Sequence, residues 1–188
     1  MFPPRPLPQA PVFLMLARLM VDKGVREYLE AARRVKRQYP EARFQLAGAL
    51  DPNPASIRQA ELDAWIREGT IEYLGKLHGV QAALAGCRYY VLPSYYREGT
   101  PRSVLEAMAT GRPIITTDAP GCRETVDPDI NGYLVPTHDS EALAAAMLRL
   151  LAADNQSVEA MAVAGLDRVA RLFDVERVNR QLMEITGL

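Results

Sequence analysis

The sequence contains little of what several protein classes require. Only two cysteines occur, Cys87 and Cys122, and they form no Cys-x-x-Cys pair, so neither a disulfide framework nor a zinc site is indicated. The only histidines, His78 and His138, have no third ligand at metal-binding spacing, and we expect no metal. This cysteine usage fits a reducing compartment, and we expect a cytoplasmic protein.

Long apolar runs and an excess of one charge are also absent. The longest apolar runs, residues 12–17 and 142–148, are far shorter than the ~20 residues of a membrane-spanning helix. Met1 is followed by prolines, which is unlike a secretory signal peptide. Lys and Arg total 22 against 23 Asp and Glu, giving a net charge of -1, so the chain lacks the positive field typical of nucleic-acid binding. Any important cation must act locally.

The apolar residues that are present, 48% of the chain, suffice for one globular domain. Short apolar runs alternate with segments of helical period, which indicates an α/β fold with a parallel sheet covered on both faces. Before it, residues 1–11 carry prolines at 3, 4, 6, 8 and 11 and read as a linker, so we expect the domain to span 12–188. The expected strands are 12–17, 43–48, 71–74, 89–92, 113–117 and 132–135, six parallel strands in a doubly wound, Rossmann-like sheet.

The helical patterns fall between and after these strands. A stripe of Val25, Tyr28, Leu29, Ala32, Val35 and Tyr39 follows the first strand. Further helices are expected at 55–67, 80–85, 101–110, 140–153, 157–172 and 175–185. The apolar stripe of the last one, Val175, Val178, Leu182 and Ile185, must face either the sheet or a neighbouring domain, and the pattern leaves both open.

The loop and helix at 93–111 carry the clearest signal for a ligand. They follow a buried strand, and ligands bind at the carboxyl ends of the strands in an open parallel sheet. Gly99 allows close backbone approach and Pro101 suits a first helical turn, so free amides there favour an anion such as a diphosphate. Arg102 opposes the helix dipole, which also hints at a nearby anion.

Two carboxylates flank this helix start. Glu98 precedes it and Glu106 lies eight positions later, a separation of about 12 Å or less that approximates the span between the two sugars of a nucleoside-diphosphate sugar. Each could accept hydroxyl hydrogens. On spacing alone the simpler interpretation is favoured, in which Glu98 stabilises the helix start and Glu106 is solvated.

Two cations follow the first strand. Arg18 and Lys23 belong at its carboxyl edge, where they could neutralise a diphosphate without a metal ion. Without further information, ordinary surface positions are an equally good interpretation.

Together these segments resemble a known family. Ala-Arg-Leu-x-x-x-Lys-Gly at 17–24, Tyr-Leu-Gly-Lys-Leu-His-Gly at 73–79, Pro-Ser-x-x-x-Glu-Gly-Thr-Pro and Leu-Glu-Ala-Met-Ala-x-Gly within 93–111, and Asn-Gly-Tyr-Leu-Val at 131–135 are similar to the carboxy-terminal half of family 4 retaining glycosyltransferases. The resemblance runs from about residue 12 to the end and is strongest to bacterial enzymes that extend polyprenyl-diphosphate-linked saccharides.

The resemblance implies the donor-binding half of a GT-B fold, with residues 1–11 as the interdomain linker. Arg18 and Lys23 would contact the donor diphosphate, Glu98 the hydroxyls of the transferred sugar and Glu106 the ribose hydroxyls. Amides near Gly99 and Thr100 would hold phosphates, and the base would lie along 75–77. The implied catalytic residues are Arg18, Lys23 and Glu98; the implied nucleotide-binding residues are Lys76, Leu77, Gly99, Thr100, Pro101, Arg102, Leu105 and Glu106.

The implied substrate is a nucleoside-diphosphate sugar, with UDP-sugar favoured. A hexose or N-acetylhexosamine would pass with retention to a glycan acceptor in cell-surface polysaccharide or lipopolysaccharide synthesis. The acceptor-binding half is missing from these residues, so we expect donor binding with little transfer, and peripheral membrane association only for an intact enzyme. Ala17, Gly48-Ala49-Leu50 and Thr100-Pro101 depart from the common pattern, which leaves nucleotide choice and loop shape open.

Two other functions are compatible with an α/β domain of this kind, and the sequence supports them to different degrees. A dinucleotide oxidoreductase is disfavoured because no Gly-x-Gly-x-x-Gly follows an expected strand. A non-catalytic module that binds a sugar nucleotide or a protein remains open.

Overall fold

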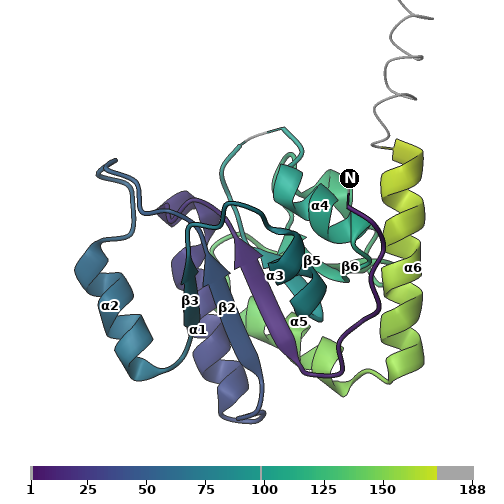
Figure 1. Cartoon of the computed structure of the whole chain (residues 1–188), viewed down its shortest axis with the longest axis horizontal. Helices are drawn as coiled ribbons and strands as arrows, with labels where there is room; N and C mark the ends of the chain where they lie inside the picture. The colour runs from purple at the N-terminus through teal and green to yellow at the C-terminus, as the bar shows by residue number, and fades with distance from the viewer. Residues whose placement is uncertain (1, 98, 173–188) are drawn as a thin grey trace, which may run out of the picture.

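The structure, a computed structural model, describes residues 2–97 and 99–172 and contains a single six-stranded sheet. Its strands are β1 (Val12–Leu16), β2 (Arg43–Ala47), β3 (Glu72–Gly75), β4 (Tyr89–Leu92), β5 (Ile114–Thr117) and β6 (Gly132–Val135). All neighbouring strands pair in parallel, in the order β3-β2-β1-β4-β5-β6 (Figure 1). The prediction of a doubly wound α/β fold with six parallel strands is confirmed.

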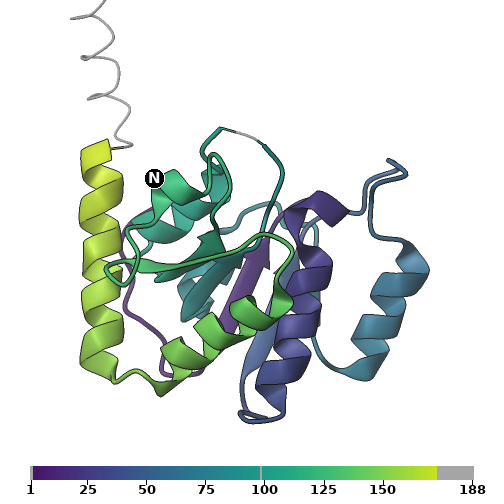
Figure 2. The same ribbon diagram turned by 180° about the vertical axis from the view of Figure 1, so that it is seen from behind.

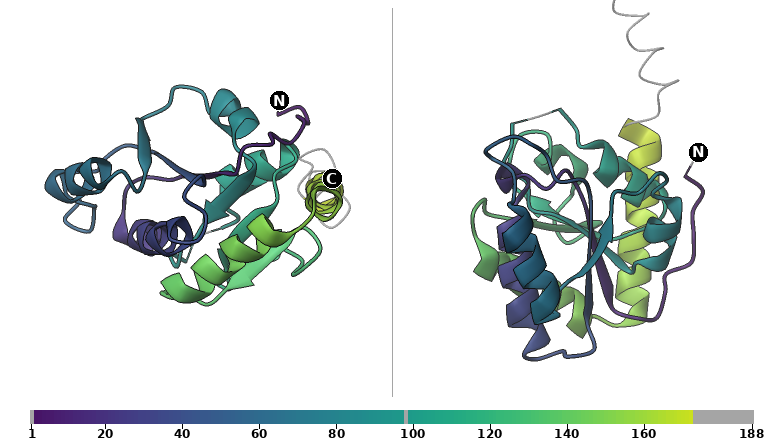
Figure 3. Two further views of the ribbon diagram at one scale, coloured as in Figure 1. Left: turned by 90° about the horizontal axis from the view of Figure 1, so that it is seen from below. Right: turned by 60° about the vertical axis from the view of Figure 1, so that its left-hand side comes forward.

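Helices cover both faces of this sheet. They are α1 (Val25–Lys36), α2 (Gln59–Glu68), α3 (Gln81–Gly86), α4 (Arg102–Ala109), α5 (Ser140–Ala152) and α6 (Asn155–Leu172). Figure 2 shows α1 and α5 packed together on one face, with α2 beside α1. The end-on view in Figure 3 places α3 across the sheet from them, and α6 packs against α4.

The sequence explains why these elements form where they do. All five residues of β1 are buried because helices cover both faces of the sheet at this strand. The expected apolar stripe of α1 is buried from Val25 to Val35. Within it, the Tyr28 hydroxyl donates to the carbonyls of Phe13 (3.0 Å) and Gln45 (3.1 Å), which fixes α1 to β1 and β2.

Several helix boundaries differ from expectation, most of them by a single residue. The helix expected from residue 55 begins at Gln59, because Ser56 pairs with Met20 in an isolated bridge and Pro52 and Pro54 shape a loop before it. Helix α4 begins one residue after Pro101, which takes the N-cap position. Helix α6 begins at Asn155, two residues earlier than expected. The helix expected at 175–185, with its apolar stripe, lies outside the described residues.

The N-terminal segment, residues 2–11, forms no helix or strand and runs alongside α6 (Figures 1 and 2). Its backbone is bonded to the domain: the Arg5 amide donates to the Thr110 carbonyl at 3.1 Å. Two buried arginines also donate to its carbonyls, Arg88 to Pro8 at 2.6 Å and Arg112 to Arg5 at 3.0 Å. That this segment links two domains stays a prediction. No helix within 2–97 and 99–172 combines the length and apolar character needed to cross a bilayer.

Candidate functional site

The strand order creates a topological switch point between β1 and β4. These strands pair, with Phe13 opposite Tyr89 and Leu14 opposite Tyr90. Their following helices diverge, because α1 packs on one face of the sheet and α4 belongs to the other. Such a switch point at the carboxyl ends of the strands is where open α/β sheets bind ligands. The loops carrying Arg18, Lys23 and the stretch 93–101 meet there.

Backbone hydrogen bonds hold the β1 and β4 loops together. The Asp22 carbonyl accepts bonds from the amides of Tyr95 (2.9 Å) and Tyr96 (3.2 Å). Gly24 makes this contact possible, because its backbone is left-handed (φ 76°) and a Cβ there would lie 2.1 Å from the Pro93 carbonyl oxygen. The two predicted segments are therefore joined through their backbones at the carboxyl edge of the sheet.

Lys23 lies against this junction. It is 8% exposed, and its Nζ lies 4.8 Å from the ring centroid of Tyr96, a cation–π contact with a side chain that is itself 47% exposed. Burial of a lysine is unusual. The sequence indicated its position at the strand edge but not this stacking partner.

Arg18 lies at the mouth of a pocket of about 250 Å³. The lining residues are Leu16, Ala17, Arg18, Ala47, Gly48, Ala49, Lys76, Leu77 and Val80. The structure thus brings together the predicted residues Arg18, Lys76 and Leu77 from two separate loops. The lining is mostly apolar with cations at the edge, which suits a flat ring system attached to a negatively charged group.

Gly48 shapes this pocket, although the sequence marked it only as part of an unusual loop. Its Cβ would lie 1.7 Å from the Ala17 carbonyl oxygen, so any larger residue would separate the ends of β1 and β2. The Gly48 carbonyl accepts a bond from the Tyr73 hydroxyl at 2.7 Å, and partial burial raises the pKa of that phenol. The neutral phenol keeps its proton for this bond, which anchors the pocket wall.

Helix α4 carries three further predicted residues, Arg102, Leu105 and Glu106. Among the described residues no side chain caps its N-terminus, and Pro101 is buried at the N-cap position. Arg102 donates from Nε to Glu106 Oε1 at 2.8 Å, with side chains 88% and 13% exposed, respectively. Arg102 therefore pairs with Glu106 along the helix, a contact that the sequence interpretation did not include. Leu105 is half-buried beside this pair.

The other residues singled out in the sequence lie in several places. Gly99 is exposed and Thr100 half-buried in the loop before α4. Glu98 lies outside the described residues. Cys122 is buried and does not line the described pockets. His138 is 60% exposed on its side chain and adopts a left-handed backbone (φ 58°).

His138 also contacts the loop after β4. Its ring centroid lies 3.7 Å from that of Tyr95, and its Nδ1 lies 3.7 Å from Glu27 Oε1. Partial burial raises the pKa of Tyr95, and the carboxylates of Glu27 and Asp22 raise it further. Tyr95 therefore lies between the loop after β4 and His138.

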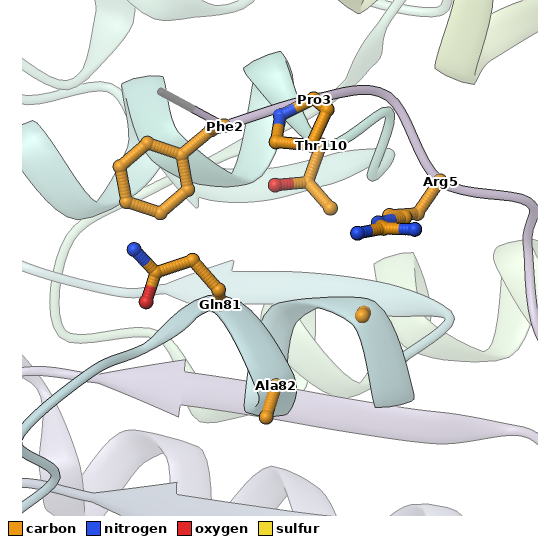
Figure 4. Close-up of a pocket in the computed structure, with 7 residues that line it drawn as sticks. Phe2, Pro3, Arg5, Gln81, Ala82 and Thr110 are labelled. Atoms are coloured by element: carbon orange, nitrogen blue, oxygen red, sulfur yellow. The ribbon is translucent and has the colours of Figure 1, made fainter.

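A larger pocket of about 410 Å³ lies elsewhere, between the N-terminal segment and α3. Figure 4 shows Phe2 above Gln81, with Arg5 and Thr110 beside them. None of its lining residues belongs to the loops after β1 or β4. The 250 Å³ pocket is the candidate site because it lies at the carboxyl ends of β1 and β2, beside the switch point, and not because of its volume. Within the described part of the chain, no three His, Cys, Asp or Glu side chains gather in a way that could hold a metal ion.

Comparison with known proteins agrees with this geometry. Residues 10–153 match the family model described as glycosyl transferases group 1. The chain belongs to this family. Two curated bacterial relatives are similar to it: the N,N'-diacetylbacillosaminyl-diphospho-undecaprenol alpha-1,3-N-acetylgalactosaminyltransferase of Campylobacter jejuni, 37% identical over 75% of this chain, and the putative colanic acid biosynthesis glycosyltransferase WcaL of Salmonella typhimurium, 31% identical over 92%.

The chain spans only 35% and 44% of the length of those two relatives. Among solved structures, Anabaena Alr3699/HepE, determined in complex with UDP, has a TM-score of 0.82 and 24% identity, covering 95% of this chain and 49% of the other. The fold is therefore that of one domain of a GT-B glycosyltransferase, as the resemblance implied.

Proposed function

We propose that this chain is the donor-binding domain of a retaining glycosyltransferase and binds a nucleoside-diphosphate sugar, with UDP-sugar favoured. The observation that carries the proposal is the meeting of Arg18, Lys76 and Leu77 around one pocket at the carboxyl edge of the sheet, beside the switch point. Two further observations support it. The N-terminus of α4, which follows the loop after β4, has no side-chain cap among the described residues, and Alr3699/HepE, which has a similar fold, was solved in complex with UDP and with UDP-glucose.

In the proposed mode of binding, the base enters the apolar pocket beside Lys76 and Leu77. Glu106 releases Arg102 and accepts hydrogen bonds from the ribose hydroxyls instead. The amides of Gly99 and Thr100 donate hydrogen bonds to the phosphates. The hydroxyls of the transferred sugar are assigned to Glu98. Pro101 sets the first turn of α4, and Leu105 packs behind the ribose.

Arg18 and Lys23 perform the electrostatic part of the proposed reaction. Negative charge accumulates on the diphosphate as the sugar leaves, and cations fixed beside it stabilise that charge most in the transition state. Two cations can do this without a metal ion. We assign transfer of a hexose or N-acetylhexosamine, with retention, to an enzyme in which a second domain supplies the acceptor.

The acceptor we propose is a glycan carried on a polyprenyl diphosphate, during synthesis of a cell-surface polysaccharide or lipopolysaccharide. The name of the Campylobacter relative, which acts on an undecaprenol-linked sugar, supports this choice. The WcaL relative is named for colanic acid biosynthesis. A cytoplasmic site of action, at the inner face of the membrane, belongs to the same proposal.

Calorimetric titration of the chain with UDP, uridine and NAD tests the donor assignment. UDP should bind more tightly than uridine. Arg18→Ala or Lys23→Ala should weaken UDP binding about ten- to a hundredfold, the value of a lost charge-assisted hydrogen bond, while uridine binding is spared. Arg67→Ala, which removes an exposed cation on α2, is the matched control. Equal UDP affinity in parent and variants would remove both residues from the site, and binding of NAD alone would overturn the assignment.

A further inference from the structure

Arg18, the proposed diphosphate ligand, already has an anionic neighbour. Its Nη1 lies 3.5 Å from Asp51 Oδ2, at the outer limit of a hydrogen bond. The Arg18 side chain is 61% exposed and that of Asp51 26% exposed. The contact is therefore a weak, partly solvated ion pair in which the carboxylate is the less exposed partner.

Asp51 is held in place by its own loop. Its amide donates to Ser56 Oγ at 3.2 Å, and its Oδ1 accepts the Asn53 amide at 2.9 Å. The Ser56 hydroxyl in turn donates to the Leu19 carbonyl at 2.8 Å, next to Arg18 in the β1 loop. One carboxylate oxygen thus stabilises the turn and the other faces the guanidinium.

A fixed carboxylate beside an exposed guanidinium acts on a ligand in a defined direction. A guanidinium offers five donors in a rigid fork, which match a phosphate better than one carboxylate oxygen at 3.5 Å. Diphosphate binding must break or share the pair with Asp51, and the negative charge of Asp51 opposes the incoming anion. Conversely, Asp51 offers Arg18 a partner when the diphosphate leaves.

We propose that Asp51 is a positioning residue that competes with the diphosphate for Arg18. It holds the guanidinium beside the pocket when no nucleotide is bound, and it promotes release of the nucleoside diphosphate. The proposal rests on the donor site proposed above. Because Asp51 acts through Arg18, its effect should require both the arginine and a charged ligand.

Asp51→Asn is the variant that isolates this effect, because the amide keeps an oxygen for the Asn53 amide and loses only the charge. We expect UDP to bind about threefold more tightly, through slower dissociation in stopped-flow measurements, with uridine affinity unchanged. In the Arg18→Ala background the same substitution should change UDP affinity by far less. Asp63→Asn, on α2, reports the effect of losing one negative charge elsewhere.

The outcomes are distinct. Unchanged or weaker UDP binding by Asp51→Asn, in a variant whose melting temperature matches the parent, overturns the exchange role and leaves the donor site standing. An equal gain in UDP affinity in the Arg18→Ala background also overturns it, since the negative charge of Asp51 would then act on UDP directly and not through Arg18. If neither parent nor variant binds UDP, the proposed function fails, and the exchange role fails with it.

Discussion

Arginines at the two edges of the sheet have opposite environments. At the amino edge, Arg88 and Arg112 precede β4 and β5; they are 5% and 0% exposed and donate to carbonyls of the N-terminal segment. At the carboxyl edge, the side chains of Arg18 and Arg102 are 61% and 88% exposed and face carboxylates. The buried pair is bonded within the fold, whereas the exposed pair is accessible to solvent and has carboxylate partners.

The partners explain this difference. The prolines in the segment 2–11 have no backbone N–H, so this segment cannot pair as a strand. Its carbonyls still need hydrogen-bond donors, and the buried guanidinium groups supply them. Burial lowers the pKa of Arg112, and its Nε and Nη1 have no hydrogen-bond partner among the described residues. Burying such a cation costs desolvation free energy, and for Arg112 desolvation is the largest cause of the lowered pKa.

The largest loss of stability is expected at Gly24, where the backbones of the two loops at the carboxyl edge touch. Gly24→Ala adds a Cβ 2.1 Å from the Pro93 carbonyl oxygen at a left-handed residue, so we expect unfolding free energy to fall by about 3–4 kcal/mol and UDP binding to be lost. Gly69→Ala is matched in φ (73° against 76°) but has nothing within 4 Å, and should cost only about 1 kcal/mol. Chemical denaturation of both variants measures the difference. Equal losses would show that the contact between the two loops is unimportant.

A smaller effect should separate the two kinds of arginine. Arg112→Met leaves the carbonyls of Arg5 and Pro6 without their donor but removes a buried charge, and we expect a net destabilisation of about 2 kcal/mol with UDP affinity unchanged. Arg102→Met should change stability by less than about 0.5 kcal/mol and weaken UDP binding several-fold. Thermal unfolding and calorimetry on the same samples test this. The comparison between edges breaks down if both variants lose the same property.

The sequence was sufficient for the scaffold because its signals are local. The unbroken apolar run of β1 and the stripe of α1 require burial on both faces of the sheet, and the parallel, doubly wound topology follows from their alternation. Arg18 and Lys23 could be placed at the strand edge for the same reason.

The contacts that set the behaviour of the site were not predictable in this way. Asp51 faces Arg18 across 33 positions, and Arg112 reaches Arg5 across 107. Nothing near either residue in the sequence marks its partner. Gly48 showed only as an irregular loop, although its close approach to Ala17 defines the pocket. Side-chain exchange and close backbone approach depend on tertiary geometry, which residue periodicity does not encode.

A third kind of arginine, exposed yet committed to a partner, gives the smallest expected effect. Arg33 on α1 pairs with Glu68 on α2, with Nε 2.6 Å from Oε1, and this bond lowers the pKa of Glu68 to about 2. A carboxyl whose pKa is lower in the folded chain stabilises it above its ordinary pKa of about 4.5, and that stability is lost as the pH falls toward 2.

Both side chains are about a third exposed, so the stabilisation is limited to about 0.5–1 kcal/mol. Glu68→Gln should lower the unfolding free energy by this amount at pH 7 and leave it unchanged near pH 2, whereas Glu159→Gln on the exposed side of α6 should have no effect at either pH. Denaturation curves across this range, at low and high salt, provide the measurement. A loss that persists at pH 2 would trace to packing between α1 and α2, and would place Arg33 with the structural arginines of the amino edge.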